Sequence, residues 1–516
     1  MMAANIADLI EHAVDAFPDR VAVACGEREL TYAELEETAN RLAHFLHHRG
    51  VGKGAHVGLY AGNSIEAVVA MIAVYKLRAV VVNVNYRYVE NELQYLFDDA
   101  ELTALIHDPV FSDKVAQVRA PGVLVQLGIT DYSHESSDRD FGERSGDDIY
   151  LLYTGGTTGY PKGVIWRHED VWRVLGGGID FMSGVPLADE WEQSKREMPP
   201  MTRLCLAPLI HGNAQWAALA ALFSGDTVVV LPQSHFDPEE VWRTIERRQV
   251  NVVVLIGDAM ARPIIEAYLS GRHDGSSLVA ISSSAALFSP SVKRQYLDAL
   301  PNVMVTDAIG SSETGFAGLG IVADVEGGAV DGPRVMPGPD TIVIDEYGRT
   351  APVGVVGRLA RGGHVPLGYY KDPEKTKALL TDVDGKRYAI PGDFARLEED
   401  GTITLLGRGN TCVNTGGEKV FPEEVEGALK AHPGVFDALV IGAADDLLGQ
   451  RVVALVQPRP DIRVDLDELD GHVRRRLAGY KVPRDVWLVD GIRRTISGKA
   501  DYRWAHEYAR GKISAD

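Results

Sequence analysis

The sequence has few cysteines, no excess of basic residues and no long apolar run, and each of these absences excludes a class of protein. Cys25, Cys205 and Cys412 are too far apart to form a metal knuckle or a disulfide framework. The formal net charge of −21 argues against a general affinity for nucleic acid or for an anionic membrane surface. The longest apolar runs, such as residues 250–256, are far shorter than the ~18 residues of a membrane-spanning helix.

The beginning of the chain, MMAANIADLIEHAVDAF, carries acidic residues and has no sustained apolar core. It therefore lacks the features of a signal peptide. The hydrophobic content of 45% and the charged content of 24% are ordinary for a soluble globular protein. We expect a soluble, cytoplasmic protein without a transmembrane segment.

Helix and strand signals alternate in the N-terminal part of the chain, which at 516 residues in total has room for roughly three domain-sized units. A helix is predicted after Thr31, because Thr31 and Glu34 have the spacing of a capping box. A strand at 56–60, a second helix at 63–77 and a buried strand at 79–82 follow. This alternation indicates parallel layering, so we predict the fold class α/β.

Toward the C-terminus the pattern changes to short strands with frequent glycines, and a domain boundary is predicted just before Asn410. Strands predicted at 438–441 and 452–456, together with two helices, indicate a small α+β unit of a usual domain size. We therefore predict a large N-terminal α/β domain of several subdomains at 1–409 and a small α+β domain at 410–516.

A glycine-rich loop at residues 153–163, YTGGTTGYPKG, follows the apolar run 149–152. Within this loop stand the glycines Gly155, Gly156 and Gly159, the adjacent threonines Thr157 and Thr158, and Lys162. Glycines allow positive φ and a close approach to a ligand, and successive backbone N–H groups in such a turn form a concave anion nest. Because Gly163 stands where a Walker loop has Ser or Thr, we predict a phosphate-binding loop of another kind. The alternative is a glycine-rich surface hairpin.

Five motifs occur in order along the chain. They are the loop at 153–163, the run 310–315 (GSSETG), the pair Gly392-Asp393, the pair Gly407-Arg408 and the terminal run 497–499 (SGK). Together they resemble the adenylate-forming (AMP-binding) superfamily of acyl-CoA synthetases, luciferases and peptide-synthetase adenylation domains, over about residues 30–499. The runs 166–168 (WRH) and 414–419 (NTGGEK) are similar to those of actinobacterial enzymes for fatty acids or steroid side-chain acids.

The resemblance implies a large N-terminal domain, a hinge and a small C-terminal domain that rotates between two half-reactions. In the first, a carboxylate attacks the α-phosphorus of Mg-ATP, which gives an acyl-adenylate and pyrophosphate. In the second, the thiol of coenzyme A takes the acyl group. The implied ligands are therefore ATP, Mg²⁺, coenzyme A and a small-molecule carboxylic acid, and a homodimer is left open. Transfer of this type needs charge neutralisation and alignment more than a covalent nucleophile.

The resemblance also implies which residues contact ATP or AMP. They are Thr154, Gly156, Thr157, Thr158, Gly159, Lys162, Ser284, Ala285, Asp307, Ile309, Gly310, Ser312, Asp393 and Arg408. Ile309 stands where relatives have a tyrosine that stacks on adenine, and Asp393 matches the carboxylate that accepts the ribose hydroxyls. Residues 283–286 match the adenine turn, although the usual glycines are absent there.

Three residues match the candidate catalytic groups of the family. Glu313 matches the magnesium-binding glutamate, a hard oxygen ligand suited to a cation that bridges phosphates. Lys499 matches the lysine whose ammonium bridges the substrate carboxylate and the α-phosphate as charge develops. His211 matches a histidine beside the acyl and thiol channel. The alternatives are a solvated acid, a solvated terminal lysine and a satisfied structural histidine.

The C-terminal part carries the positions that match the second half-reaction. Gly416, Gly417 and Glu418 match a loop that lines the pantetheine tunnel for coenzyme A. Asn410 falls at the hinge, where relatives carry Asp or Lys, and asparagine tolerates unusual backbone angles.

Other functions remain as alternatives. A free-standing ligase that loads an acyl group onto a carrier protein is the runner-up, whereas Gly212 argues against an amino-acid substrate because amino-acid adenylating enzymes have an aspartate near that position. A luciferase-like oxygenase is a third option, and no motif in the sequence specifically indicates it. A non-catalytic nucleotide-binding protein would be expected to lose one of the four key side chains, and all are present: Lys162, Glu313, Asp393 and Lys499. Linear, branched and steroidal acids all remain open as substrates.

Overall fold

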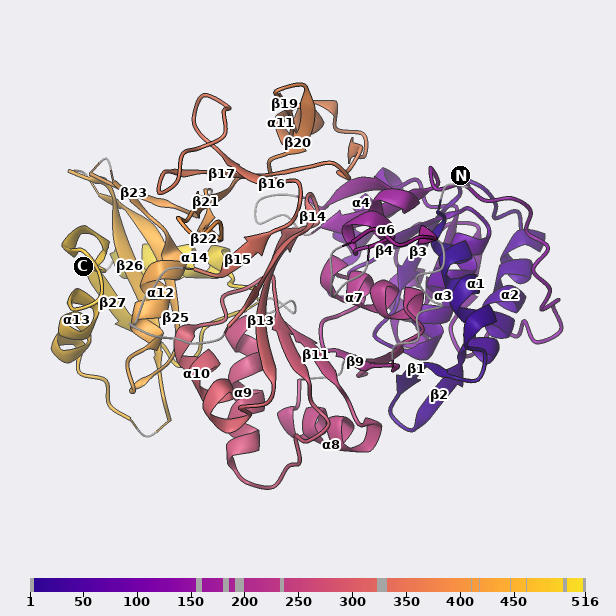
Figure 1. Ribbon diagram of the computed structural model, residues 1–516, viewed down its shortest axis with the longest axis horizontal. Coiled ribbons are helices and arrows are strands. Elements are labelled where there is room, and N and C mark those ends of the chain that lie inside the picture. The colour runs from indigo at the N-terminus through magenta and orange to yellow at the C-terminus, as the bar shows by residue number, and fades with distance from the viewer. Residues whose placement is uncertain are drawn as a thin grey trace.

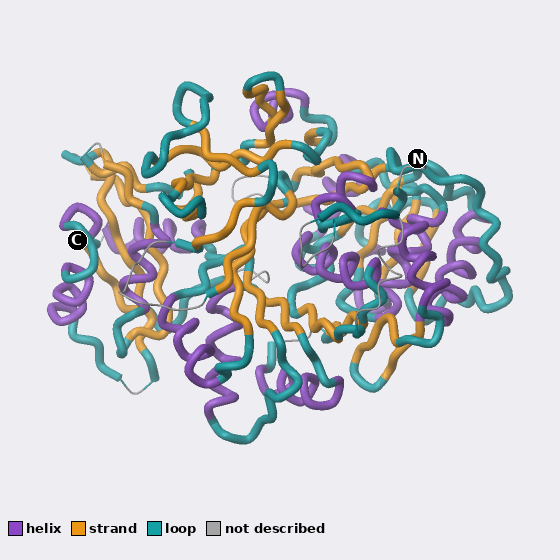
Figure 2. The backbone as a smooth tube through the Cα atoms, in the orientation of Figure 1, coloured by secondary structure: helices purple, strands orange, loops and turns teal. Residues whose placement is uncertain are grey.

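Three β-sheets with helices packed on them organise the part of the chain that the computed structural model describes (Figure 1). The described residues are 4–154, 160–179, 185–190, 199–232, 236–322, 332–409, 411–416, 418–445, 447–460, 462–494 and 499–513. The N-terminal elements lie on the right of Figure 1 and the C-terminal elements on the left, and Figure 2 shows strands running through the middle.

The first sheet has seven described strands in the order β18-β8-β7-β4-β3-β5-β6. They are β3 (His56–Tyr60), β4 (Val80–Asn83), β5 (Ala104–His107), β6 (Val123–Gln126), β7 (Ile149–Thr154), β8 (Lys162–Arg167) and β18 (Gly368–Tyr369). The strands from β7 to β6 pair in parallel, which confirms the predicted α/β layering. β8 turns back antiparallel to β7, and β18 pairs antiparallel with β8.

The helices around this sheet bear out the N-terminal sequence signals. They are α1 (Ile6–Ala16), α2 (Tyr32–His48), α3 (Ile65–Lys76), α4 (Glu90–Asp99), the short η1 (Pro109–Phe111) and α5 (Ser112–Ala116). The capping box predicted at the start of α2 is confirmed, because the Thr31 hydroxyl accepts from the Glu34 N–H at 3.2 Å and the Glu34 carboxylate accepts from the Thr31 N–H at 2.8 Å. α3 is apolar almost all round and buried, as expected of a helix with packed neighbours on every side.

The second sheet is the longest, with fifteen described strands. They are β1 (Val21–Cys25), β2 (Arg28–Thr31), β9 (Thr202–Cys205), β10 (Thr227–Val230), β11 (Val252–Leu255), β12 (Ala280–Ser283), β13 (Met304–Ser311), β14 (Gly315–Ile321), β15 (Arg334–Pro337), β16 (Thr341–Ile344), β17 (Val356–Gly362), β19 (Leu380–Val383), β20 (Lys386–Ala389), β21 (Asp393–Leu397) and β22 (Ile403–Arg408). The helices in this part of the chain are α6 (His168–Val174), α7 (Gly212–Phe223), α8 (Pro238–Arg248), α9 (Gly257–Leu269), α10 (Pro290–Ala299) and α11 (Pro373–Leu379). Of these, α6 also contacts β7 and β8, and α11 also contacts β18, which are strands of the first sheet. From β1 through β10, β9, β11 and β12 to β13 the strands run parallel, and from β13 onward they alternate in direction.

The third sheet belongs to a small C-terminal unit. Its elements are β23 (Val413–Thr415), β24 (Glu418–Val420), α12 (Pro422–Lys430), β25 (Val435–Asp445), β26 (Gly449–Pro458), α13 (Leu466–Arg474), η4 (Gly479–Lys481), β27 (Asp485–Leu488) and α14 (Tyr502–Ile513). The strands predicted at 438–441 and 452–456 are confirmed within β25 and β26. The two faces of the sheet bury separate apolar clusters, so the unit has its own core. The boundary before Asn410 stays a prediction, and Asn410 itself lies outside the described residues.

The C-terminal unit rests on the long sheet through charged contacts. The ammonium of Lys430 at the end of α12 lies 3.2 Å from the carboxylate of Asp258 in α9, and both side chains are buried. Arg459 lies 3.0 Å from Glu266 of the same helix. These contacts bring the C-terminal unit against α9 and β22, beside the carboxyl ends of the parallel strands.

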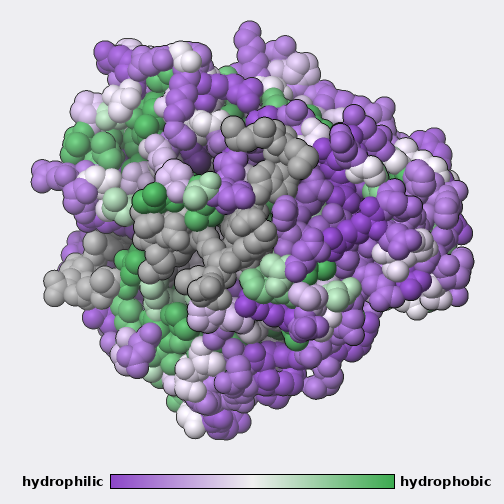
Figure 3. Space-filling model, turned by 45° about the vertical axis from the view of Figure 1, so that its right-hand side comes forward, coloured by the Kyte–Doolittle hydropathy of each residue, from purple (hydrophilic) through white to green (hydrophobic). Residues whose placement is uncertain are grey.

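Within the described ranges, no helix combines the length and the apolar character that crossing a membrane requires. Figure 3 shows hydrophilic side chains over most of the right-hand part of the visible face, with hydrophobic ones gathered toward the left.

Candidate active site

The carboxyl ends of the central parallel strands converge on one region, the usual place for a ligand in an open α/β sheet. His211 is the N-cap of α7, which follows β9, and Ser283 ends β12. Glu313 lies in the turn between β13 and β14. The turn is tight because a Cβ on Gly310 would come within 2.2 Å of the Gly315 carbonyl oxygen. Trp166 supports it by donating its indole N–H to the Ser312 carbonyl at 2.9 Å.

The predicted phosphate loop connects two paired strands. Thr154 ends β7, Lys162 begins β8, and the two residues are register partners. The antiparallel pair therefore holds both ends of the loop together. Four predicted contacts of the loop lie outside the described residues and stay predictions: Gly156, Thr157, Thr158 and Gly159.

A buried asparagine ties the loop to the His211 segment. The Asn83 carboxamide donates to the carbonyls of Tyr153 at 2.8 Å and Ile210 at 2.7 Å, and it accepts from the Tyr153 N–H at 2.7 Å. The same segment is held again at Leu209, whose N–H and carbonyl bond the side chains of Asn63 and Gln215. Sequence reasoning missed Asn83, although a polar residue directly after the apolar strand 79–82 is a signal that could have found it.

Lys499 reaches this region from the C-terminal unit. The residue is exposed, yet partial desolvation of its ammonium by the surrounding protein lowers the pKa of that ammonium; the charge of Arg408 lowers this pKa further, whereas Glu313 and Asp393 raise it. Lys499 in turn acts on His211, whose pKa is lowered to about 4 by burial first and by Lys499 second. The structure thus brings together residues predicted from four distant parts of the sequence.

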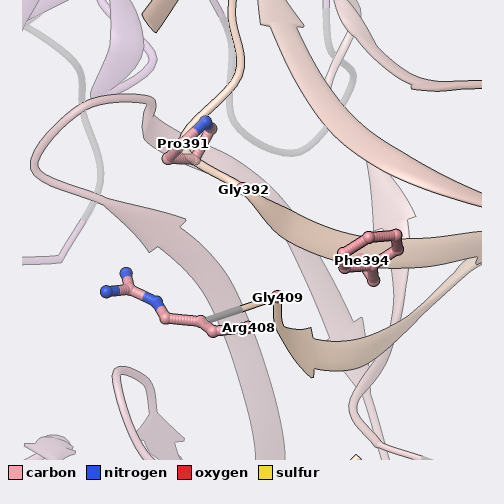
Figure 4. A pocket seen from close by; sticks show the side chains of 5 residues that line it. All are labelled: Pro391, Gly392, Phe394, Arg408 and Gly409. Atoms are coloured by element: carbon pink, nitrogen blue, oxygen red, sulfur yellow. The ribbon is translucent and has the colours of Figure 1, made fainter. Parts of the chain in front are cut away.

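Asp393 and Arg408 are paired residues of β21 and β22, and the charges of both interact with that of Lys499. The Arg408 guanidinium donates to the Asp393 carboxylate at 3.0 Å, and burial raises the pKa of Asp393. A pocket of about 400 Å³ opens beside them, lined by Pro391, Gly392, Phe394, Arg408 and Gly409 (Figure 4). In Figure 4 the guanidinium extends from the end of its strand, away from the Phe394 ring.

Tyr369 contacts two of the predicted site residues, Glu313 and Lys162. The sequence did not predict Tyr369 as a site residue. Its hydroxyl donates to a carboxylate oxygen of Glu313 at 3.0 Å, and the Lys162 ammonium lies 5.6 Å from its ring centroid. The two contacts connect positions far apart in the chain, and no local pattern around Tyr369 indicates them.

The turn after β12 carries unusual backbone geometry. Ala285 has φ of +65°, in the left-handed region that favours glycine and costs other residues roughly 1–2 kcal/mol. The chain adopts this conformation with an alanine, in a turn where the predicted resemblance implied glycines. Ser284 is held next to it by the side chain of Asn213, the second residue of α7.

Other predicted contacts are less accessible. Asp307 is buried and its carboxylate lies 2.5 Å from the ammonium of Lys293, so this acid already has a partner. Ile309 is 4% exposed and packs with Ala317 and Val335, whereas Gly310 next to it is exposed. The adenine contact of Ile309 stays a prediction.

The predicted coenzyme A loop lies at a hairpin of the C-terminal sheet. Gly416, with φ of +59°, and Glu418 belong to the β23–β24 connection, and Gly417 lies outside the described residues. The Gly416 N–H donates to the Leu448 carbonyl at 3.0 Å. In this arrangement the hairpin packs within its own unit while Lys499 occupies the site.

Sequence comparison identifies the class of protein that this fold and site define. Residues 10–370 match the AMP-binding enzyme family, and residues 424–499 match the AMP-binding enzyme C-terminal domain. The chain therefore belongs to the AMP-binding enzymes, which confirms the predicted superfamily.

Relatives that match over nearly the whole chain belong to a narrower group of AMP-binding enzymes, the CoA ligases. The chain is 54% identical to a 3-oxocholest-4-en-26-oate–CoA ligase of Rhodococcus rhodochrous, over 98% of this chain and 96% of that protein. It is 52% identical to a medium/long-chain-fatty-acid–CoA/3-oxocholest-4-en-26-oate–CoA ligase of Mycobacterium tuberculosis (strain ATCC 25618 / H37Rv), over 100% of this chain and 98% of that protein.

Solved structures share the fold over nearly the whole chain. The anthranilate CoA ligase AuaEII in complex with anthranoyl-AMP gives a TM-score of 0.86 at 22% identity, with 99% of each chain covered. ATP-bound MatB from Rhodopseudomonas palustris gives 0.83 at 26% identity, and apo MatB gives 0.74 at 25% identity, each over 98% of this chain and 99% of the other.

Proposed function

We propose that the chain is an ATP-dependent, AMP-forming acyl-CoA ligase that activates a carboxylic acid as its adenylate and transfers the acyl group to coenzyme A. The observation that carries the proposal is the position of Lys499. This lysine comes from the C-terminal unit, and its charge interacts with those of Arg408, Glu313 and Asp393 and acts on His211. Relatives above 50% identity over their full length are CoA ligases, which supports the acceptor.

Lys499 is the candidate catalytic group of the first half-reaction. As the substrate carboxylate attacks the α-phosphorus, negative charge builds up between the two, and a preorganised ammonium positioned there stabilises that charge. Lys162 is assigned to the β- and γ-phosphates at the other end of the triphosphate. In this scheme Lys162 holds the leaving pyrophosphate and Lys499 acts at the reacting phosphorus.

Asp393 and Arg408 are assigned to the ribose. A buried carboxylate beside a pocket can accept both ribose hydroxyls, and the Arg408 contact at 3.0 Å fixes its orientation. The better match to ATP-bound MatB than to apo MatB supports an arrangement suited to adenylation.

The residues present fit a magnesium ion carried in with ATP. Mg²⁺ is usually held by one or two carboxylates together with substrate phosphates and waters, and a dedicated protein cage is unusual. Glu313 supplies one such carboxylate, and the described residues contain no cluster of three or more metal-ligating side chains. Bound there, the ion would neutralise phosphate charge, while Glu313 orients it.

His211 is assigned to the acyl carbon and the path of the thiol. Because its pKa is about 4, the imidazole is neutral near pH 7. A neutral ring beside Lys499 adds no competing positive charge and can line the thiol path after the lysine leaves.

The second half-reaction requires the C-terminal unit to move, because Lys499 fills the place where the thiol must arrive. We assign this motion to a hinge at Asn410 and the pantetheine contact to Gly416, Gly417 and Glu418. A cytoplasmic location, where ATP and coenzyme A are available, is part of the proposal, and a homodimer stays a prediction.

For the substrate, we propose medium- and long-chain fatty acids and steroid side-chain acids such as 3-oxocholest-4-en-26-oate. The full-length relatives named for these acids support this choice.

The test measures pyrophosphate release and thioester formation over a panel of carboxylates, namely acetate, octanoate, palmitate, 3-oxocholest-4-en-26-oate and phenylalanine. Coenzyme A and a phosphopantetheinyl carrier protein are compared as acceptors. We expect release with the long-chain and steroid acids and thioester only with coenzyme A. Thioester on the carrier protein alone would overturn the assignment of the acceptor.

A further inference from the structure

The side chain of Tyr369 connects the two halves of the candidate site. β18, which carries it, is an edge strand of the seven-stranded sheet and pairs with β8, whose first residue is Lys162. Glu313 belongs to the β13–β14 turn of the other, longer sheet. The Tyr369 hydroxyl donates to a Glu313 carboxylate oxygen at 3.0 Å, and the Lys162 ammonium lies 5.6 Å from the centroid of the same ring.

The backbone of Tyr369 is fixed on both sides. Next to it, Tyr370 donates its N–H to the Gly163 carbonyl at 2.8 Å, which attaches this segment to the start of β8. The Tyr369 N–H donates to the hydroxyl of Thr376 in α11 at 2.8 Å, and that hydroxyl donates to the Asp372 carbonyl at 2.8 Å. The phenol is therefore presented from a rigid position.

The neighbouring tyrosine has a different environment. Successive side chains of a strand point to opposite faces. The Tyr370 hydroxyl accordingly donates to Glu101 at 2.7 Å, outside the candidate site. Each of these two adjacent tyrosines therefore donates a hydrogen bond to a glutamate. Within the described part of the chain, Tyr369 contacts predicted site residues and Tyr370 does not.

We propose that Tyr369 is a positioning residue for Mg-ATP: its hydroxyl sets the orientation of the Glu313 carboxylate toward the metal, and its ring sets the position of Lys162 toward the phosphates. This inference rests on the proposed function. A carboxylate that accepts one fixed O–H bond keeps its other oxygen directed, which lowers the cost of ordering it when the ligand binds. A cation near an aromatic face is likewise attracted and restrained.

The first test is Tyr369→Phe, which removes the hydroxyl and keeps the ring beside Lys162. Titration calorimetry measures binding of a non-hydrolysable ATP analogue with and without Mg²⁺. We expect about tenfold weaker binding with Mg²⁺ and unchanged binding without it, since loss of a hydrogen bond to a charged group has an effect of this order. The matched control, Tyr370→Phe, should bind as the native protein does in both conditions.

A folding defect would weaken binding equally in both conditions, so an equal loss with and without Mg²⁺ overturns the inference. So does native binding by Tyr369→Phe. The outcome is distinct from failure of the proposed function, because a protein that is not an ATP-dependent ligase would show no Mg-dependent binding in its native form either.

A double-mutant cycle gives the second readout. Tyr369→Phe and Glu313→Gln are combined, and Mg-dependent binding of the analogue is measured for all four proteins. If the hydroxyl acts through Glu313, the double variant should bind no more than about twofold weaker than Glu313→Gln alone, because coupled residues are non-additive. Additive losses would assign Tyr369 a merely structural role.

Discussion

Replacing Lys499 with alanine should separate the two half-reactions. The lysine is on the C-terminal unit, yet its charge acts on Arg408, Glu313 and Asp393 of the large unit. In the variant, the two carboxylates lose a positively charged neighbour, and no ammonium is left to stabilise charge at the α-phosphorus. In the proposed scheme, by contrast, the thioester half-reaction uses an orientation in which this lysine has left the site.

The expected size of the effect follows from the positive charge that the lysine is proposed to supply at the reacting phosphorus. Removing one preorganised electrostatic donor from a water-excluded site costs about 2.7–4 kcal/mol, or roughly 100- to 1,000-fold in rate. We therefore expect carboxylate-dependent pyrophosphate release to fall at least about 100-fold. Thioester formation from a supplied acyl-adenylate and coenzyme A should stay within about twofold of the native rate.

The assay follows pyrophosphate in the first reaction and acyl-CoA in the second, on the same preparation. Lys512→Ala is the control, because Lys512 is an exposed lysine of the last helix, in the same unit. If Lys499→Ala slows both half-reactions equally, the reasoning is refuted, since the lysine would then support the fold or both orientations.

Three further predictions concern the movement and the ionisation of the C-terminal unit. Asn410→Pro should leave pyrophosphate release near native and slow thioester formation; unchanged thioester formation would contradict the hinge. Lys430→Met removes a buried partner of Asp258 and weakens the contact between the C-terminal unit and α9. It should therefore slow pyrophosphate release about tenfold (~1.4 kcal/mol). The control Lys481→Met breaks the ion pair with Glu424 inside the C-terminal unit and should leave the rate of pyrophosphate release unchanged. Burial raises the pKa of Glu423 to about 8. The protonated carboxyl therefore contributes to the stability of the fold below the ordinary pKa of a glutamate, and this contribution is lost as the pH rises to about 8. Glu423→Gln should therefore reduce the fall in Tm between pH 5.5 and 8.5, and an equal fall would contradict this.

Several features of the fold and of the site could be predicted from local sequence. The capping box at Thr31 needs residues three apart, and the buried strand at 79–82 needs only a short apolar run. The ordered motifs from the glycine-rich loop to Lys499 predicted the AMP-binding class, which comparison with known proteins confirms.

Contacts between distant residues could not be predicted in this way. The bond from Tyr369 to Glu313 joins positions 56 apart, and the bonds from Asn83 join positions 70 and 127 apart. They arise because separate strands end at the same place, which depends on sheet order. The burial of Ile309 and the pairing of Asp307 with Lys293 depend in the same way on neighbours that the motif does not contain.

Local sequence was sufficient to predict the α/β class, the small C-terminal unit and the class of chemistry that the motifs indicate, because periodicity, capping and motif spacing are local properties. The tertiary structure was needed to show that the charge of Lys499 interacts with Asp393 and Glu313, and that Tyr369 donates a hydrogen bond to the predicted metal ligand. The physical reason is that charge, burial and hydrogen bonding at a site are set by side chains from separate elements, and packing alone brings those elements together.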